Sequence, residues 1–364
     1  MRVAVAGAGG FIGSHVVEKL RAAGHEVLAI DRPQADLQVA RSCGAEAVAA
    51  DVAVEGALTS LLRGCERAVN ATGLFDLGAP MVALRAGNVD AADRFVRAAK
   101  EAGLERVVHL SSVAVYGPVR VTPMPEDGPQ RPRSAYDVTK QEGEAAVLAH
   151  NGQGIEVAVL RPTLVYGPRS RYGHALFISL TAMGRALGWE ALPLPLGGPT
   201  GHHVHVEDVA RAAELLLTAP GAAGQAFNIA DDTPIALGDA LASIAEAVGL
   251  RVRPVRGASV LWPVALRALP WVPGMAIDRL NRWFDDGYEA LRRRGWTPVL
   301  KGRFDRDWLG YFTGRFIFDT RRIKALGFAP AHPDFRLAVG EVVRWYRDAG
   351  WLPPPREKRK RARA

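Results

Sequence analysis

The sequence predicts an α/β fold, a doubly wound parallel sheet with a smaller, interleaved C-terminal region. Short apolar runs alternate with segments of helical period through residues 1–165, as in parallel sheets whose strands are joined by helices. Glycines at intervals of three follow the first apolar run. From residue 166 the alternation gives way to chain that proline and glycine interrupt.

The first apolar run, residues 3–6, is followed by Gly7, Gly10 and Gly13 and by a helical pattern that starts near Phe11. Without side chains, Gly7 and Gly10 let the backbone turn sharply and approach a pyrophosphate closely. The helix directs its free N–H groups and the positive end of its dipole at that anion. Gly13 lets the helix pack closely on the strand. The stretch therefore predicts a dinucleotide-binding βαβ unit.

The second apolar run, residues 27–30, ends on Asp31. Its carboxylate can accept hydrogen bonds from a ribose 2′-hydroxyl and would repel a 2′-phosphate, which favours NAD. Arg32 beside it is a cation that tolerates the 2′-phosphate, so NADP stays open. The strict G-x-G-x-x-G spacing fails at Ile12, so the prediction depends on the strand, helix and acid around the glycines.

The later strands of this predicted sheet end on residues suited to ligand contact. Asp51 follows one strand, where a carboxylate can meet an adenine amino group, and Thr72 and Gly73 follow the next. Ser112 follows the fifth strand. Ligands of open α/β sheets bind at the C-terminal ends of the strands. The further strands are expected at 47–50, 67–71, 106–110 and 155–160, and helices at 88–102 and 136–150.

The chain after residue 166 divides its residues between the sheet and a second region. A strand at 204–206, a helix at 208–218, a strand at 226–229 and a last helix at 335–347 are expected. We therefore expect a dinucleotide-binding Rossmann domain at 1–165, with its sheet completed by about 203–231. The substrate-binding region is expected at 166–202 and 232–352, with a basic disordered tail at 353–364.

Residues 255–315 stand out because they contain five of the eight tryptophans. Their apolar run at 260–277 is interrupted by Arg267 and three prolines, so it does not predict a membrane span. Lying at a membrane surface is one alternative. We favour the other, in which this insert covers an apolar pocket.

Composition predicts an ordinary globular chain, with 48% hydrophobic and 23% charged residues. Of the formal net charge of +8, the tail at 353–364 carries +5. We expect this tail to be a solvated end, and we favour neither nucleic acid as a partner nor peripheral contact with anionic lipid.

The cysteine and histidine patterns predict neither a disulfide framework nor a metal site. Cys43 and Cys65 are the only cysteines, and no signal peptide precedes the first strand, so we expect a reducing cytoplasm. His202, His203 and His205 form a cluster, but no Cys or carboxylate pattern at zinc spacing joins it.

Tyr136 and Lys140 lie four residues apart on one face of a predicted helix. A close ammonium favours the phenolate and lowers the pKa of the phenol, which makes a general acid/base. Ser112 can donate a hydrogen bond to a substrate oxygen. Together these residues suit the interconversion of a carbinol and a carbonyl, with hydride passing to or from nicotinamide.

Several motifs occur in a characteristic order along the chain. They are Gly7-x-x-Gly10-x-x-Gly13, Ser111-Ser112-Val113-Ala114-Val115-Tyr116-Gly117, Tyr136-x-x-x-Lys140, Arg161-Pro162-Thr163-Leu164-Val165-Tyr166-Gly167-Pro168, His205-Val206-Glu207-Asp208-Val209-Ala210, Phe227-Asn228-Ile229 and Leu326-Gly327-Phe328 with Trp345-Tyr346. With these motifs the chain resembles an extended short-chain dehydrogenase/reductase, in the group of NAD-dependent epimerases, dehydratases and 3β-hydroxysteroid dehydrogenase-like enzymes. The resemblance covers about residues 1–250 and 316–352.

The resemblance implies an NAD(P)-dependent enzyme with Ser112, Tyr136 and Lys140 as catalytic residues. It also implies a homodimer formed by the helices at 88–102 and 136–150. The implied cofactor contacts are Gly7, Gly10, Phe11, Ile12, Gly13, Asp31, Arg32, Asp51, Val52, Ala71, Thr72, Gly73, Asn88, Tyr136, Lys140, Pro162 and Thr163.

Departures from the family pattern narrow the expected activity. Dehydratases carry Asp-Glu where this chain has Val113-Ala114, so dehydration is not expected. Nucleotide-sugar epimerases usually hold the diphosphate with an Arg at the position of Gly201, although Arg169, Arg171 or Arg185 could replace it.

We therefore expect an oxidoreductase that interconverts a secondary alcohol and a ketone on a small, hydrophobic, sterol- or flavonoid-like substrate. One alternative is a nucleotide-sugar 4-epimerase with tightly bound NAD. Another is a family member without catalysis that senses nucleotides or binds nucleic acid; the basic tail favours it, but the intact catalytic set argues against it.

Overall fold

A computed structural model describes residues 1–52, 56–76, 78–255, 262, 268, 271–303 and 315–354. The chain divides into two compact units. The first unit comprises Met1–Val165, His202–Asp232 and Phe316–Pro333, and the second comprises Tyr166–Gly201, Thr233–Arg315 and Asp334–Ala364.

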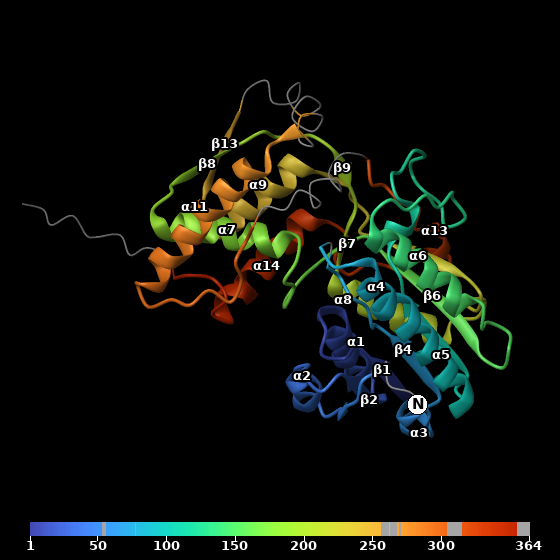
Figure 1. The fold of residues 1–364 in the computed structure, drawn as a ribbon. Helices are drawn as coiled ribbons and strands as arrows, with labels where there is room; N and C mark the ends of the chain where they lie inside the picture. The colour runs from blue at the N-terminus through green and yellow to red at the C-terminus, as the bar shows by residue number, and fades with distance from the viewer. Residues whose placement is uncertain are drawn as a thin grey trace, which may run out of the picture. The chain divides into compact units, whose positions relative to one another are not determined.

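The first unit contains a seven-stranded sheet in the order β11-β6-β5-β4-β1-β2-β3, and every neighbouring pair is parallel (Figure 1). The strand order reverses between β1 and β4, where such sheets bind ligands. The predicted doubly wound parallel sheet is confirmed. Its strands are β1 Arg2–Ala6, β2 Glu26–Asp31, β3 Glu46–Ala49, β4 Arg67–Asn70, β5 Arg106–Leu110, β6 Glu156–Pro162 and β11 Ala226–Ile229.

Helices cover both faces of this sheet. Successive residues of a strand point to opposite faces, so each strand contributes side chains to both cores. Val3 and Val5 of β1 belong to the core under α1 (Phe11–Ala22) and α8 (Val206–Thr218), whereas Ala4 and Ala6 belong to the core under α3, α5 and α6. This two-sided burial explains why the strands are apolar throughout. The other elements of this unit are α2 Gln38–Ser42, α3 Ala57–Leu62, α4 Met81–Arg85, η1 Ala86–Asp90, α5 Ala91–Ala102, η2 Val113–Tyr116, α6 Ala135–Leu148, β10 His203–His205 and α13 Arg321–Ala325.

Three sequence predictions differ from the structure in detail. The helix expected at 88–102 begins earlier, in the π-helical turn η1, and the strand expected at 204–206 ends at His205 because Val206 starts α8. Residues 316–333, which we assigned to the substrate-binding region, lie in the first unit. The reason is that Phe318 packs on Tyr116 and Met124, and Ile323 joins the core under α8.

The second unit is built from helices and two-stranded sheets. Strand β13 pairs with β8 in parallel, and β12 pairs with β9 antiparallel. Helices α7, α9 and α14 share one core, and α11 packs on α7 through Phe284, Tyr288 and Leu291. The elements are α7 His174–Leu187, β8 Ala191–Leu194, β9 Thr200–Gly201, β12 Ile235–Ala236, α9 Leu237–Val248, β13 Arg251–Pro254, α11 Gly274–Arg292 and α14 Phe335–Asp348. Strand β7, Leu164–Tyr166, pairs with β10, and its residues Leu164 and Val165 belong to the first unit.

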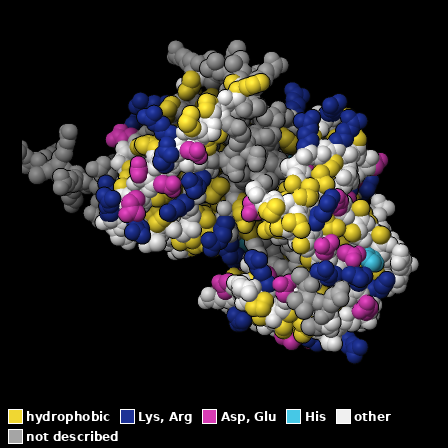
Figure 2. All heavy atoms as spheres, in the orientation of Figure 1, with side chains coloured by type: hydrophobic (Ala, Val, Ile, Leu, Met, Phe, Trp, Pro, Cys, Tyr) yellow, Lys and Arg dark blue, Asp and Glu magenta, His cyan; other side chains and the backbone are white. Residues whose placement is uncertain are grey.

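The tryptophan-rich insert is described only in part, since residues 256–261, 263–267, 269–270 and 304–314 lie outside the described residues, as do 355–364 of the predicted tail. Within its described part, Trp271 and Met275 are 85% and 79% exposed. On the face shown in Figure 2, hydrophobic, basic and acidic side chains are interspersed over the second unit. Among the described residues, no helix is both long and apolar enough to cross a membrane.

Candidate functional site

The glycine turn after β1 is a backbone cradle that side chains would fill. Gly7 has a φ of +77°, and a Cβ there would lie 2.6 Å from the carbonyl oxygen of Ala71. A Cβ on Gly13 would lie 1.9 Å from the carbonyl oxygen of Gly7, so the first turn of α1 packs directly on the loop. Gly10 is the N-cap of α1 and offers no side-chain cap, which leaves the N-terminus of the helix to an anion.

Asp31 and Asp51 lie at the same edge of the sheet as this turn. The Asp31 carboxylate accepts hydrogen bonds from the backbone N–H of Gly9 at 2.8 Å and of Arg32 at 2.8 Å, so the acid is fixed beside the glycines. Asp51 is exposed and follows β3, whose end is joined to β2 by a bond from the Ala50 N–H to the Asp31 carbonyl. Next to it, Val52 is buried in the core under α3.

The exit of β4 meets η1 and α6. A Cβ on Gly73 would lie 3.2 Å from Asn88 Oδ1 and 3.8 Å from Lys140 Nζ, so only glycine leaves this space open. Buried Asn88 is held by the Leu74 backbone and by Thr139 Oγ1. The predicted contacts Ala71, Thr72, Gly73, Asn88 and Lys140 are therefore brought together by the fold.

The catalytic candidates gather where β5 ends and α6 begins. Ser134 caps α6 in a capping box with Asp137, which places Tyr136 in the first turn of the helix. The Ser112 and Tyr136 side chains hydrogen-bond to each other. Lys140, one turn further, is buried and donates from Nζ to the Leu110 carbonyl at 2.8 Å.

The pKa of Tyr136 differs from the one that the sequence led us to expect. The protein packed around the phenol raises the pKa of Tyr136, the nearby Asp137 carboxylate raises it further, and the Ser112 hydrogen bond lowers it. Burial also lowers the pKa of Lys140 to about 8. Lys140 is not among the groups that shift the pKa of Tyr136, and the raised pKa is opposite in direction to the lowered one expected from the sequence.

The residues after β6 bring a further polar group to this edge. Thr163 is buried, its N–H donates to the Ile229 carbonyl at 3.1 Å, and its hydroxyl has no hydrogen-bond partner in the described part of the chain. Pro162 is the last residue of β6. A buried hydroxyl without a partner suits a polar ligand atom such as a carboxamide.

Two groups near the site were not singled out from the sequence. His109 is 1% exposed, and neither of its ring nitrogens has a hydrogen-bond partner among the described residues; burial and the charge of Lys140 hold its pKa well below the usual range. Under α6, Arg161 forms a buried ion pair with Glu144 and donates to the Tyr116 hydroxyl at 2.6 Å. The partners of Arg161 come from distant segments, and the burial of His109 is set by the packing around it, so local patterns carry no signal for either residue.

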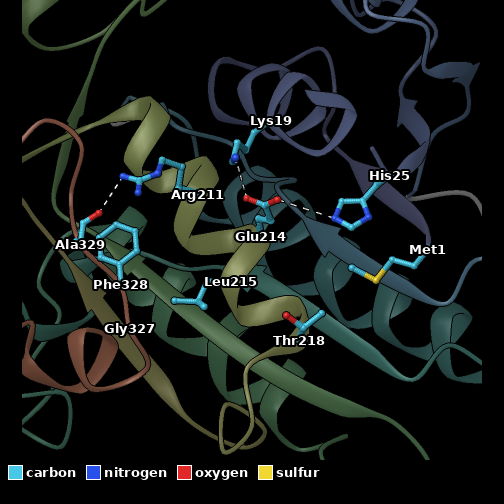
Figure 3. A pocket seen from close by; sticks show the side chains of 10 residues that line it. All are labelled: Met1, Lys19, His25, Arg211, Glu214, Leu215, Thr218, Gly327, Phe328 and Ala329. Atoms are coloured by element: carbon cyan, nitrogen blue, oxygen red, sulfur yellow. Dashed lines mark hydrogen bonds and ion pairs between the residues drawn. The ribbon is translucent and has the colours of Figure 1, made fainter. Parts of the chain in front are cut away.

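A separate cavity of about 420 Å³ lies between α1, α8 and residues 327–329 (Figure 3). Its charged groups already have partners, since Lys19 and His25 both face Glu214 and Arg211 donates to the Ala329 carbonyl. It contains none of the catalytic candidates. The glycine cradle, the Asp31 carboxylate and the Gly73 opening fit a bound dinucleotide and define the candidate site instead.

Comparisons with known proteins agree with this geometry. The model of the NAD dependent epimerase/dehydratase family matches residues 3–230. A UDP-glucose 4-epimerase of Mycolicibacterium smegmatis is 32% identical over 266 residues, 68% of this chain and 83% of that relative. A 3-beta-hydroxysteroid dehydrogenase of Mycolicibacterium neoaurum is 26% identical over 356 residues, 91% of this chain and 95% of that relative.

Among solved structures, MoeE5 in complex with UDP-glucose and NAD is 25% identical, with a TM-score of 0.67, and the match covers 96% of this chain and 99% of that chain. The family match spans more than half of the sequence and includes the glycine cradle and the candidate residues Ser112, Tyr136 and Lys140. The chain therefore belongs to the NAD-dependent epimerase/dehydratase family, whose members are dehydrogenases, epimerases and dehydratases of the extended short-chain dehydrogenase/reductase fold.

Proposed function

We propose that this protein is an NAD(P)-dependent oxidoreductase, NAD being favoured, that interconverts a secondary alcohol and a ketone on a small hydrophobic substrate of the sterol or flavonoid class. The observation that carries the proposal is the meeting of Ser112, Tyr136 and Lys140 beside the Gly73 opening. That arrangement supports the proposal, because a hydride transfer of this kind needs a hydrogen-bond donor and a proton carrier close to the nicotinamide.

The arginines of the second unit support a substrate without a diphosphate. Gly201 pairs with Ile235 and has no side chain to offer an anion. Of the three arginines that could replace the family Arg, Arg185 donates to the Val248 carbonyl at 2.8 Å and Arg171 stacks over Trp351 at 4.9 Å. These contacts compete with diphosphate binding.

In the proposed mechanism, Ser112 donates a hydrogen bond to the substrate oxygen and Tyr136 exchanges a proton with it. The bound nicotinamide supplies or accepts the hydride. The raised pKa of Tyr136 keeps its phenol protonated at neutral pH, so it acts as the acid when a ketone is reduced. Lys140 would hold the nicotinamide ribose, and the hydrogen bond between Asn88 and Thr139 fixes the neighbouring turn.

Three further residues complete the proposed contacts to the dinucleotide. Asp31 would hold the adenosine ribose, Asp51 the adenine, and Thr163 the carboxamide.

The proposal includes a homodimer whose interface is formed by the two helices η1–α5 and α6. Light scattering at micromolar concentration tests it, and a monomer there would contradict the interface but not the chemistry.

The test is a turnover screen with purified protein. Sterols, flavonoids and UDP-sugars are each offered with NAD or NADP, and the absorbance of reduced nicotinamide is followed. We expect a net absorbance change with a hydroxysterol or flavonoid, and none with Tyr136→Phe. Conversion of a UDP-sugar without added cofactor would instead contradict the proposal.

A nucleotide-sugar 4-epimerase is the second candidate, and a specific observation favours it. The UDP-glucose 4-epimerase of M. smegmatis has the higher identity, although it matches 68% of this chain against 91% for the steroid dehydrogenase. Mass spectrometry of the purified protein distinguishes the two, since an epimerase retains NAD through purification.

A further inference from the structure

The fold brings the imidazole of His332 to His205 and Glu207, which lie two residues apart in the sequence. The ligand atoms of His205, Glu207 and His332 all lie within 4.8 Å of one another. His332 Nε2 is 3.0 Å from Glu207 Oε2, and the rings of His205 and His332 are 3.9 Å apart between centroids. From the sequence we expected no metal site, because no Cys or carboxylate pattern at zinc spacing joins the histidine cluster. Only the fold adds His332.

The backbone that carries these three side chains is fixed by its own hydrogen bonds. His205 is the N-cap of α8 and Glu207 lies in the first turn of that helix. Asp208, which is 1% exposed, accepts from the N–H of Ala331 at 2.7 Å and of His332 at 2.9 Å. Asp208 therefore holds the segment that carries His332 against the start of α8.

We propose that His205, Glu207 and His332 bind a divalent transition-metal ion, Zn²⁺ by ligand type, that fastens residues 326–333 to the N-terminus of α8. Two imidazoles and one carboxylate are a donor set that zinc accepts, with water as the fourth ligand. With bonds of about 2.0–2.1 Å, tetrahedral ligand atoms lie about 3.4 Å apart, so small side-chain rotations close the site.

The surroundings permit the ion to enter and to stay. Glu207 is exposed and His332 is half-buried, which leaves a path from solvent, whereas His205 is buried on the inner side. The bond from the Glu207 N–H to His205 Nδ1 is long, at 3.3 Å. Amides at the start of a helix also bond water, so the ring can turn a nitrogen to the metal at small cost.

The site is separate from the proposed hydride chemistry. Helix α8 covers the face of the sheet whose core contains Val3 and Val5, and α6, which carries Tyr136 and Lys140, covers the other face. We therefore assign the ion a structural role, and its removal affects stability before turnover.

The test uses the full chain without a polyhistidine tag, freed of metal with a chelator and titrated with ZnCl₂ in a calorimeter. We expect one equivalent to bind, and Co²⁺ to give the visible absorption bands of tetrahedral coordination. His332→Ala and the isosteric Glu207→Gln should each weaken binding at least about tenfold, since each removes a ligand.

His150→Ala is the matched control, because His150 also pairs with a carboxylate, Asp93 at 2.7 Å, but no third metal-binding side chain joins them among the residues that the structure describes. It should leave zinc binding unchanged. The melting temperature should rise with Zn²⁺ in the wild type and in His150→Ala, and not in His332→Ala or Glu207→Gln. No binding by the wild type, or equal binding by all variants, would overturn the proposal, and the second result would identify adventitious zinc only.

Discussion

The two units of this chain encode structure and chemistry in different ways. The first unit is a seven-stranded parallel sheet whose strands are buried on both faces, and the family match at residues 3–230 covers most of it. The second unit combines helices with two-stranded sheets. All the catalytic candidates lie in the first unit, so under the proposed function the chemistry resides there and the second unit selects the substrate.

The positions of the tryptophans allow the two units to be followed separately in experiments. All eight tryptophans lie in the segments of the second unit and none in those of the first. Tryptophan fluorescence therefore reports on the second unit, while circular dichroism reports on both. The two signals together show which unit a substitution affects.

The largest effect is expected for chemistry confined to the first unit. Tyr136→Phe removes the proton carrier and keeps the ring that contacts Phe75 edge-on at 5.0 Å. Turnover should fall about 10³-fold, within the range for general acid catalysis. The affinity for NAD and both unfolding signals should stay the same. Steady-state kinetics and calorimetry measure this, and wild-type turnover would refute the assigned role.

Breaking the buried ion pair of Arg161 and Glu144 should show whether the two units unfold separately. Glu144→Ala leaves the guanidinium of Arg161, which is 3% exposed, without its carboxylate. The loss of unfolding free energy should be about 3–5 kcal/mol. In urea, the circular dichroism transition should shift more than the tryptophan transition. Equal shifts would show that the two units unfold as one, and Glu142→Ala, which removes an exposed partner of Arg85, is the control.

Acid should act on the second unit through His174. Burial lowers the pKa of His174 to about 3, so the ring stays neutral in the folded chain while the unfolded chain takes up a proton below about pH 6.5. This contribution to stability is complete above pH 6.5 and is lost as the pH falls towards 3. At pH 5 the loss is about 2 kcal/mol. Tryptophan fluorescence in urea at pH 7 and pH 5 should show it, and His174→Phe should remove the difference.

The smallest effect is expected within α14 of the second unit. A Cβ on Gly340 meets nothing within 4 Å, and this glycine lies in the interior of the helix. Gly340→Ala should stabilise the protein by about 0.5–1 kcal/mol, because alanine loses less backbone entropy. Gly350→Ala is the control, since Gly350 has a φ of +72° and should lose stability instead. A gain at both positions would contradict the explanation.

Much of the first unit was predictable because its signals are local. The apolar runs that end at Ala6, Ile30 and Leu110 are buried strands, since period and length suffice to identify a strand with two covered faces. The spacing of Gly7, Gly10 and Gly13 predicted a cradle that the backbone geometry shows directly. Tyr136 and Lys140 share a helix, so their spacing alone placed them together.

The remaining features depend on contacts between distant segments. The sequence determined the features that are local in the chain: the glycine turn, the residues that share a helix face and the residues that follow each strand. Only the tertiary structure decided that burial raises the pKa of Tyr136, that residues 316–333 belong to the first unit and that His332 reaches Glu207. The physical reason is that desolvation and approach are set by what packs around a group, and the packing partners come from parts of the chain that local patterns do not connect.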